Sequence, residues 1–181
     1  MIVRNACRHW NAFGKWADDA YFLERWGSAK VNLFVAPNPQ GEHPDTLDTQ
    51  RKAQVPGTFA DLIRSQGKNV SIRAHTLGSG SPLDDMIEDI DDHWLHEFTR
   101  PSLSYPRRRV FIYRGGASLW HQHPLDDHLT FQVHGAKDFA FLPPDQSRCI
   151  AEINTHELYS FKVDTTRYPG WKTIRPWSAR L

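Results

Sequence analysis

Residues 107–144 constrain the fold of this chain more than any other stretch, because they hold a histidine pair between two strand-like patterns. His121 and His123 are two residues apart, and successive side chains of a β-strand point to opposite faces of the sheet. In an extended strand both imidazoles therefore project from one face, side by side. The spacing predicts a β-sheet with two imidazoles that can hold a metal ion between them.

Two carboxylates and a further imidazole, Asp126, Asp127 and His128, come shortly after the histidine pair. Such a mixture suits iron, manganese, nickel, copper or zinc, and two histidines with one carboxylate on one side of the metal favour iron(II) in an oxygenase. The chain has ten histidines in 181 residues, so pairs of this spacing also arise by chance. The pair alone therefore leaves a surface or core role open.

The residues around the pair resemble two related motifs. The first motif of the cupin superfamily is matched in spacing by Gly115, His121, His123, Asp127 and Gly135. Asp127 stands where that motif usually has glutamate. The segment LWHQHPLDDHLTFQVHGAKDFAFLPPDQ is similar to the central motif of the JmjC-type, cupin-like 2-oxoglutarate oxygenases. The residues that fit its hairpin and following strand are Gln132, Gly135, Lys137, Phe139, Phe141, Leu142, Pro143 and Pro144.

The resemblance implies roles for several side chains. By that match His121 is the first iron ligand, Lys137 binds the distal carboxylate of 2-oxoglutarate, and Ser118 assists Lys137 with its hydroxyl. His128 falls where the family commonly has an asparagine near the co-substrate. The implied cofactor is iron(II), with 2-oxoglutarate as co-substrate, and the implied substrate is a small molecule or a peptide.

The chain also departs from the family pattern. His123 occupies the place of the usual acidic ligand, and one extra residue separates His121 from Gln132. Either His123 is itself a ligand, or the turn is bulged and Asp126 or Asp127 takes that place. A local set of His121, His123 and Asp127 is closer to a small cupin. Two alternatives stay open: a metal-binding cupin that uses no 2-oxoglutarate, and a non-catalytic jelly-roll interaction module.

The family resemblance implies a mostly β fold, a double-stranded β-helix or jelly roll, with N-terminal helices packed outside. We expect one cupin-like domain over residues 1–181, because this length suits a single core. The family continues into a strand with a distal histidine ligand that has no counterpart here, so we expect the domain to be incomplete at its C-terminus. We also expect a homodimer that covers the sheet edge left exposed.

Composition excludes several classes of function. The chain has 22 basic and 21 acidic residues, so no strong field favours nucleic acid or an anionic membrane. No stretch approaches the roughly 20 apolar residues of a membrane span, and the first residues lack the apolar core of a signal peptide. The two cysteines have neither metal-site nor disulfide spacing. We expect a soluble, cytoplasmic protein without a nucleic-acid or membrane partner.

Local patterns predict the remaining elements. Helices are expected at residues 2–27 and 58–66, strands at 31–36, 70–77 and 159–163, and a long surface loop at 38–57. Gly27 is expected to end the first helix, and Thr58 to cap the second with Asp61 in its first turn.

Two polar features of these elements bear on function. Alternation in strand 70–77 places Ser71, Arg73 and His75 on one face, from which Arg73 or His75 could reach a ligand. The acidic run that follows lacks the spacing and the glycine of an EF-hand loop, so we expect no calcium site. Its apolar residues are expected to form a buried stripe under a solvated acidic face, comprising Leu83, Met86, Ile87 and Ile90.

Overall fold

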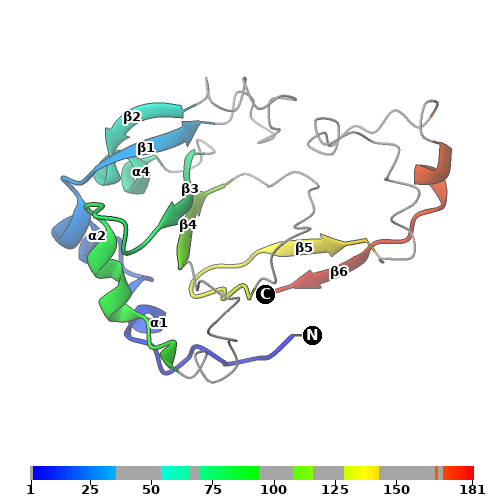
Figure 1. Cartoon of the computed structure of the whole chain (residues 1–181), viewed down its shortest axis with the longest axis horizontal. Helices are drawn as coiled ribbons and strands as arrows, with labels where there is room; N and C mark the ends of the chain where they lie inside the picture. Colours follow the sequence, from blue (N-terminus) through cyan, green and yellow to red (C-terminus); the bar gives the residue numbers. More distant parts are fainter. Residues whose placement is uncertain are drawn as a thin grey trace.

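A computed structural model arranges the helices of the N-terminal half on one side of a sheet and a separate two-stranded ribbon on the other (Figure 1). It describes residues 2–35, 54–65, 70–93, 108–115, 129–142, 166 and 169–181. The elements are α1 (Asn11–Lys15), α2 (Asp19–Trp26), β1 (Lys30–Val35), β2 (Gln54–Thr58), α4 (Phe59–Arg64), β3 (Val70–Thr76), η1 (Asp84–Asp89), β4 (Arg109–Arg114), β5 (Asp138–Phe141), η5 (Pro169–Thr173) and β6 (Trp177–Arg180).

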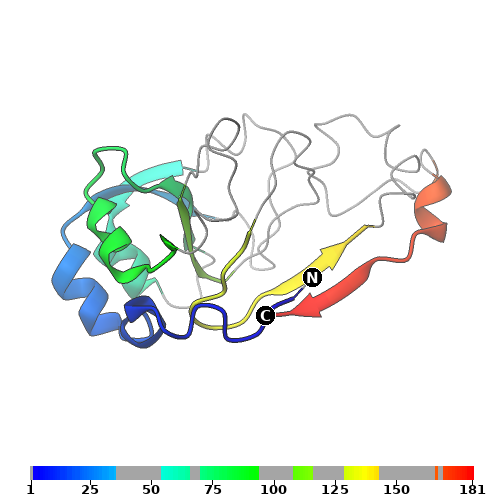
Figure 2. The same ribbon diagram turned by 60° about the horizontal axis from the view of Figure 1, so that its bottom comes forward.

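The described strands form two antiparallel sheets. Four of them make one sheet in the order β2-β1-β3-β4, and β5 pairs with β6 in a two-stranded ribbon. All the pairings are antiparallel, as expected for a mostly β fold of jelly-roll type. Figure 2 shows the ribbon running away from the helices. A strand at β6 was not predicted, and the strand predicted at residues 159–163 lies outside the described residues.

One face of the four-stranded sheet is covered by helices. Because side chains alternate along a strand, each of β1, β3 and β4 sends every second residue to this face. Burying one large apolar side chain there contributes roughly 1.5–3 kcal/mol. This helix-packed face brings together Phe22, Trp26, Phe59, Leu62 and Ile63 from the helices and Val31, Leu33, Val70, Ile72 and Val110 from the strands. The predicted N-terminal helices therefore supply much of the core.

The helical region predicted over residues 2–27 is two helices rather than one. Asp18 has an extended backbone and accepts a hydrogen bond from the amide of Ala20 at 2.8 Å, which caps α2. A side chain that satisfies a free amide at a helix start favours a new helix at that point. Gly27 ends α2, as predicted, and its amide donates to the carbonyl of Leu23.

The second predicted helix is confirmed as α4, with Thr58 as its cap. The Thr58 hydroxyl accepts from the amide of Asp61 at 3.2 Å, and the Asp61 carboxylate accepts from the amide of Thr58 at 2.8 Å. These reciprocal bonds form a capping box. They hold the pKa of Asp61 below its usual value, because the backbone and hydroxyl bonds stabilise the charged carboxylate.

The long loop predicted at residues 38–57 is wrong at its C-terminal end, where Gln54 begins β2. The misleading signal was Pro56, which has no amide hydrogen to donate to a sheet. In the described sheet β2 stands at the edge, beside β1 alone, and an edge strand tolerates proline.

The acidic run contains the predicted buried stripe, but part of its acidic face is also buried. Leu83 and Met86 are fully buried. Asp89 and Asp92 are only 4% and 8% exposed, which corrects the expectation of a solvated acidic face. Asp92 receives two hydrogen bonds from Arg108, at 2.5 and 2.8 Å. A buried carboxylate needs such partners, because its desolvation is costly otherwise.

Asp89 joins η1 to the N-terminal helices. Its carboxylate accepts hydrogen bonds from Lys15 Nζ at 3.0 Å, from Trp16 Nε1 at 3.1 Å and from the Tyr21 hydroxyl at 2.6 Å. Burial by itself would raise the pKa of Asp89, but the bonds from Tyr21, Lys15 and Trp16 outweigh it, so the pKa is below its usual value. The carboxylate is thus held charged, and its role is to fasten α1 and α2 to η1.

Candidate functional site

The face of the four-stranded sheet opposite the helices carries a row of paired residues. Phe34 of β1 pairs with Ser71 of β3, and Ser71 pairs with Tyr113 of β4. Paired residues of antiparallel strands project from the same face, and Phe111 shares it because it is two positions from Tyr113. We call Phe34, Ser71, Phe111 and Tyr113 the second face. Phe34 and Ser71 are buried whereas Phe111 is 49% exposed, so this face is closed over β1 and β3 and open at β4.

Among the site residues predicted from the sequence, Lys137 lies within the described residues, and the structure places it at this face. Its backbone is fixed at the start of the ribbon, where its amide donates to the carbonyl of Leu181 and its carbonyl accepts from the amide of Leu181, both at 3.1 Å. Its Nζ lies 5.1 Å from the centre of the Tyr113 ring and 5.0 Å from the centre of the Phe139 ring. The half-buried side chain thus bridges the second face and the ribbon.

The turn before Lys137 explains two residues of the motif. Gly135 has a φ of +74°, in the left-handed region that favours glycine. The side-chain amide of Gln132 donates to the carbonyl of His134 at 2.6 Å, which closes the turn. The Gln-x-x-Gly-x-Lys pattern therefore encodes a local backbone shape, and that shape delivers Lys137 to β5.

Two stacked aromatic pairs surround the Lys137 amine. Phe111 and Tyr113 of β4 have ring centres 6.4 Å apart and nearly parallel planes, and Phe139 and Phe141 of β5 stack in the same way at 5.7 Å. Each pair comes from alternate positions of one strand, which places both rings on the same face. The outer ring Phe141 is 54% exposed, like Phe111, so the aromatic surface continues from the amine toward solvent.

This arrangement can bind an anion. An ammonium held over ring faces is attracted by their negative quadrupole and keeps its full positive charge. The neighbouring rings also displace water, and an electrostatic interaction is stronger where the local dielectric constant is low. The role of Lys137 in binding a carboxylate stays a prediction, and the structure adds two rings that contact its amine.

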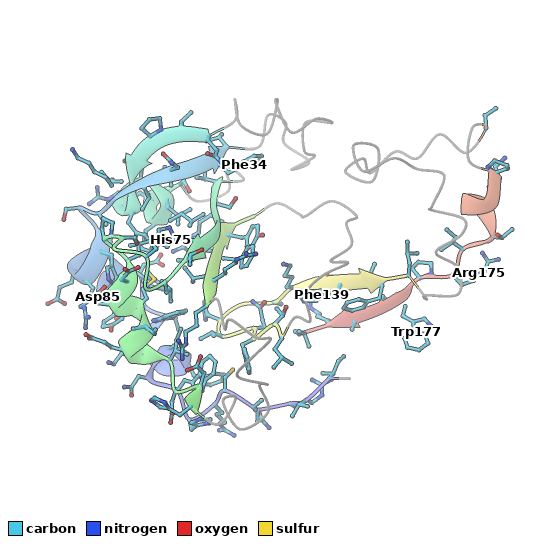
Figure 3. All side chains as sticks on the ribbon, in the orientation of Figure 1. Phe34, His75, Asp85, Phe139, Arg175 and Trp177 are labelled. Atoms are coloured by element: carbon cyan, nitrogen blue, oxygen red, sulfur yellow. The ribbon has the colours of Figure 1, made fainter. Side chains whose placement is uncertain are left out.

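His75 is on the other face from the one that alternation predicted. Ile72 pairs with Ile112 but His75 pairs with Val110, so β3 has one extra residue between these pairs. Such a bulge reverses the alternation beyond it, and His75 shares the helix-packed face with Val110 (Figure 3). The expectation that His75 reaches a ligand from the face of Ser71 is therefore wrong, and the side chain of Arg73 lies outside the described part of the chain.

His75 instead belongs to the turn between β3 and η1. Its Nε2 lies 2.5 Å from the Ser81 hydroxyl oxygen, which also accepts from the amide of Leu83 at 3.0 Å. The Asp84 carboxylate accepts from the amides of Gly80 and Ser81 at 2.6 and 3.0 Å. Burial lowers the pKa of His75, with Asp84 partly opposing, so the neutral imidazole is favoured. The amides that could serve as an oxyanion hole are already bonded to Asp84, which makes this cluster structural.

The proposed metal ligands and two further site residues lie outside the described residues. They are His121, His123, Asp127, Ser118 and His128. Within the described ranges no group of three or more His, Cys, Asp or Glu side chains is placed to hold a metal ion. The same ranges contain no helix long and apolar enough to cross a membrane.

Tyr113 was not predicted as a neighbour of Lys137. Alternation over β4 could have placed Phe111 and Tyr113 together on one face, but nothing local says which face meets Lys137. That information is in the pairing of Tyr113 with Ser71 across β3 and β4.

Two comparisons with known proteins bear on this site. A family described as the cupin-like domain matches residues 1–181. The chain is also similar to the bifunctional peptidase and (3S)-lysyl hydroxylase JMJD7 from Homo sapiens, at 26% identity over 178 residues. That alignment covers 91% of this chain and 54% of the relative, so the chain spans about half the length of that protein.

Proposed function

Because this chain belongs to the cupin-like domain family, we propose that it is an iron(II)- and 2-oxoglutarate-dependent oxygenase that hydroxylates its substrate. The observation that carries the proposal is the position of Lys137, whose Nζ lies against the second face between Tyr113 and Phe139. A cation at the start of β5 is where the family motif requires one for the distal carboxylate of 2-oxoglutarate.

The residues present fit the co-substrate. The dicarboxylate needs a cation for one end, and Lys137 supplies one beside aromatic rings. Its carbon chain needs an apolar wall, and the rings of Phe34, Phe111 and Tyr113 on the second face supply one. Ser118 and His128 complete the proposed contacts with 2-oxoglutarate.

The residue types also fit iron(II), with His121, His123 and Asp127 as the proposed ligands. Two imidazoles and a carboxylate are the ligand types of a facial triad, which leaves coordination positions open. When bound, iron supplies the activation of dioxygen that oxidises an unactivated C–H bond. The chain itself has three tasks: Lys137 holds the co-substrate, the aromatic surface excludes water, and the strands fix the orientation of both.

We propose a lysyl side chain of a peptide or protein as the substrate class to test first. The support is the name of the similar human protein, which describes it as a lysyl hydroxylase. An extended side chain could reach the site past the exposed rings of Phe111 and Phe141.

The proposal can be tested by measuring iron content, 2-oxoglutarate binding and succinate formation with lysine-containing peptides. We expect the His121→Ala/His123→Ala double variant to lose iron and turnover, and Lys137→Ala to keep iron but bind 2-oxoglutarate at least tenfold more weakly. Lys137→Arg should recover part of that binding, because it restores the charge. His9→Ala, at an exposed histidine that pairs with Asp91, is the matched control and should change neither.

Two results would contradict the proposal. Iron binding without any effect of 2-oxoglutarate would support a metal-binding cupin of another kind. Failure of the wild-type chain to retain any divalent metal after reconstitution would support a non-catalytic interaction module.

A further inference from the structure

We propose that Tyr113 and Phe139 are positioning residues, whose rings hold the Lys137 ammonium in place and thereby set the affinity of the site for a carboxylate. The inference rests on the proposed function, because it concerns the same co-substrate. Its basis is that one amine lies about equally far from two ring centres, 5.1 Å from Tyr113 and 5.0 Å from Phe139.

The two rings come from different sheets. Tyr113 is in β4 of the four-stranded sheet and Phe139 is in β5 of the ribbon, two residues beyond Lys137. The arrangement of amine and rings therefore exists only when the ribbon lies against the second face. Each ring is stacked on a second one, Phe111 or Phe141, which restricts its motion. A lysine side chain has four rotatable bonds, so ordering its amine before the ligand arrives reduces the entropy lost on binding.

Aromatic rings suit this task better than a carboxylate would. On the helix-packed side Asp92 holds Arg108 with two hydrogen bonds, and the two charges cancel. A ring face attracts an ammonium without adding a negative charge of its own. Rings can therefore orient the Lys137 amine without adding an anion that would compete with a carboxylate ligand.

A simpler interpretation is that the rings only cover the apolar stem of Lys137. The two interpretations predict different effects of a leucine substitution at Tyr113 or Phe139 on ligand affinity. Leucine keeps an apolar but smaller side chain and has no ring quadrupole, so it removes the electrostatic contact and keeps part of the apolar cover. An aromatic replacement preserves both.

The experiment measures 2-oxoglutarate binding to the chain of residues 1–181, loaded with manganese(II) so that no turnover occurs. We expect Tyr113→Leu and Phe139→Leu each to weaken binding about threefold and the double variant about tenfold. Tyr113→Phe and Phe139→Trp should stay within about twofold of the wild type, because they keep a ring. Phe13→Leu, at a phenylalanine of α1 that is 42% exposed, is the control and should have no effect.

Turnover gives a second readout. With iron(II), the leucine variants should raise the KM for 2-oxoglutarate and leave kcat nearly unchanged, because the contact acts on ground and transition state alike. Equal binding by the leucine and aromatic variants would overturn the proposal. Thermal unfolding of each variant identifies any variant that fails to fold. If the double variant does not fold, the binding affinities of the two single variants decide the test.

A ligand-free measurement separates this inference from the proposed function. Protons next to Lys137 Nζ should show upfield ring-current shifts by NMR in the wild type, and the double leucine variant should lose them. Absence of these shifts in the wild type would overturn the positioning role. If the wild-type chain shows the upfield shifts but binds no 2-oxoglutarate, the proposed function and the carboxylate part of the inference are refuted. The contact of the rings with the amine would then still hold.

Discussion

The two faces of the four-stranded sheet treat charge in opposite ways. On the helix-packed face Asp89 and Asp92 are buried and receive hydrogen bonds from Lys15 and Arg108 among others, so opposite charges cancel. On the second face Lys137 lies against aromatic rings, which hold a cation without removing its charge. The ion pairs of the helix-packed face fasten elements together, whereas the ring contacts orient the Lys137 amine without a carboxylate.

The difference also separates stability from function. The helix-packed face contains the hydrophobic cluster and most of the described ion pairs, so substitutions there should change the free energy of unfolding. The rings near Lys137 are half-buried or exposed, so substitutions there should change ligand affinity instead. The following predictions test this division, from the largest expected effect to the smallest.

Phe34→Ala tests whether the second face is packed as tightly over β1 as the helix-packed face is. Phe34 is 4% exposed, so its truncation should lower the free energy of unfolding by about 3–5 kcal/mol, as for a core phenylalanine. Urea unfolding followed by tryptophan fluorescence measures this loss, with the exposed Phe13→Ala as control. A loss below about 1 kcal/mol would mean that Phe34 is not enclosed in solution.

Asp89→Ala tests the polar fastening of the N-terminal helices. The substitution leaves the Trp16 indole and the Tyr21 hydroxyl without their acceptor, and it should lower the free energy of unfolding by roughly 2–4 kcal/mol. Affinity for 2-oxoglutarate should not change in the folded protein. A variant as stable as the wild type would show that Asp89 does not join η1 to the helices.

His75 should give the stability a modest dependence on pH. Burial lowers the pKa of His75 in the folded chain below its usual 6.5, so near and below pH 6.5 the unfolded chain binds more protons. The stabilisation by neutral His75 is thus complete above pH 6.5 and is lost as pH falls through the lowered folded value. His75→Gln should remove this slope in unfolding curves recorded from pH 7.5 to pH 5. An unchanged slope in the His75→Gln variant would show that other titratable groups cause the pH dependence of stability.

Glu88→Gln should have the smallest effect. Glu88 pairs with Arg25 at 3.3 Å, but its side chain is 67% exposed, and Arg25 also contacts Asp85. Exposed pairs are screened by solvent and salt. We expect no shift in thermal unfolding midpoint outside experimental error. A clear shift would show that this exposed ion pair stabilises the chain as the buried contacts of Asp89 do. Burial would then not be what separates stabilising charges from neutral ones.

Local rules predicted several features correctly because few neighbours decide them. The Thr58 cap and the Asp61 carboxylate lie within one helical turn, so their bonds follow from spacing. The same holds for the turn at Gln132 and Gly135, where one side-chain bond and one left-handed residue bring Lys137 to β5. Predictions of strands near β1 and β3 were confirmed for the same reason, since alternation is a property of the strand itself.

Other features depended on partners far away in the sequence. The bulge that turns His75 to the helix-packed face is defined by pairing with β4, and alternation within β3 carries no sign of it. Asp89 was predicted to lie on a solvated acidic face, because its three hydrogen-bond donors come from helices that are distant in the sequence. The ligand set of His121, His123 and Asp127, the single domain and the homodimer stay predictions.

The sequence by itself determined which residue types are available for chemistry, which short segments become strands or capped helices, and that Lys137 follows a tight turn. Only the tertiary structure decided which face of the sheet is filled by helices and which rings meet the Lys137 amine. The physical reason is range: caps, turns and alternation are set by atoms within a few residues. Burial and the partners of a charge are set by strands and helices that meet only when the whole chain has folded.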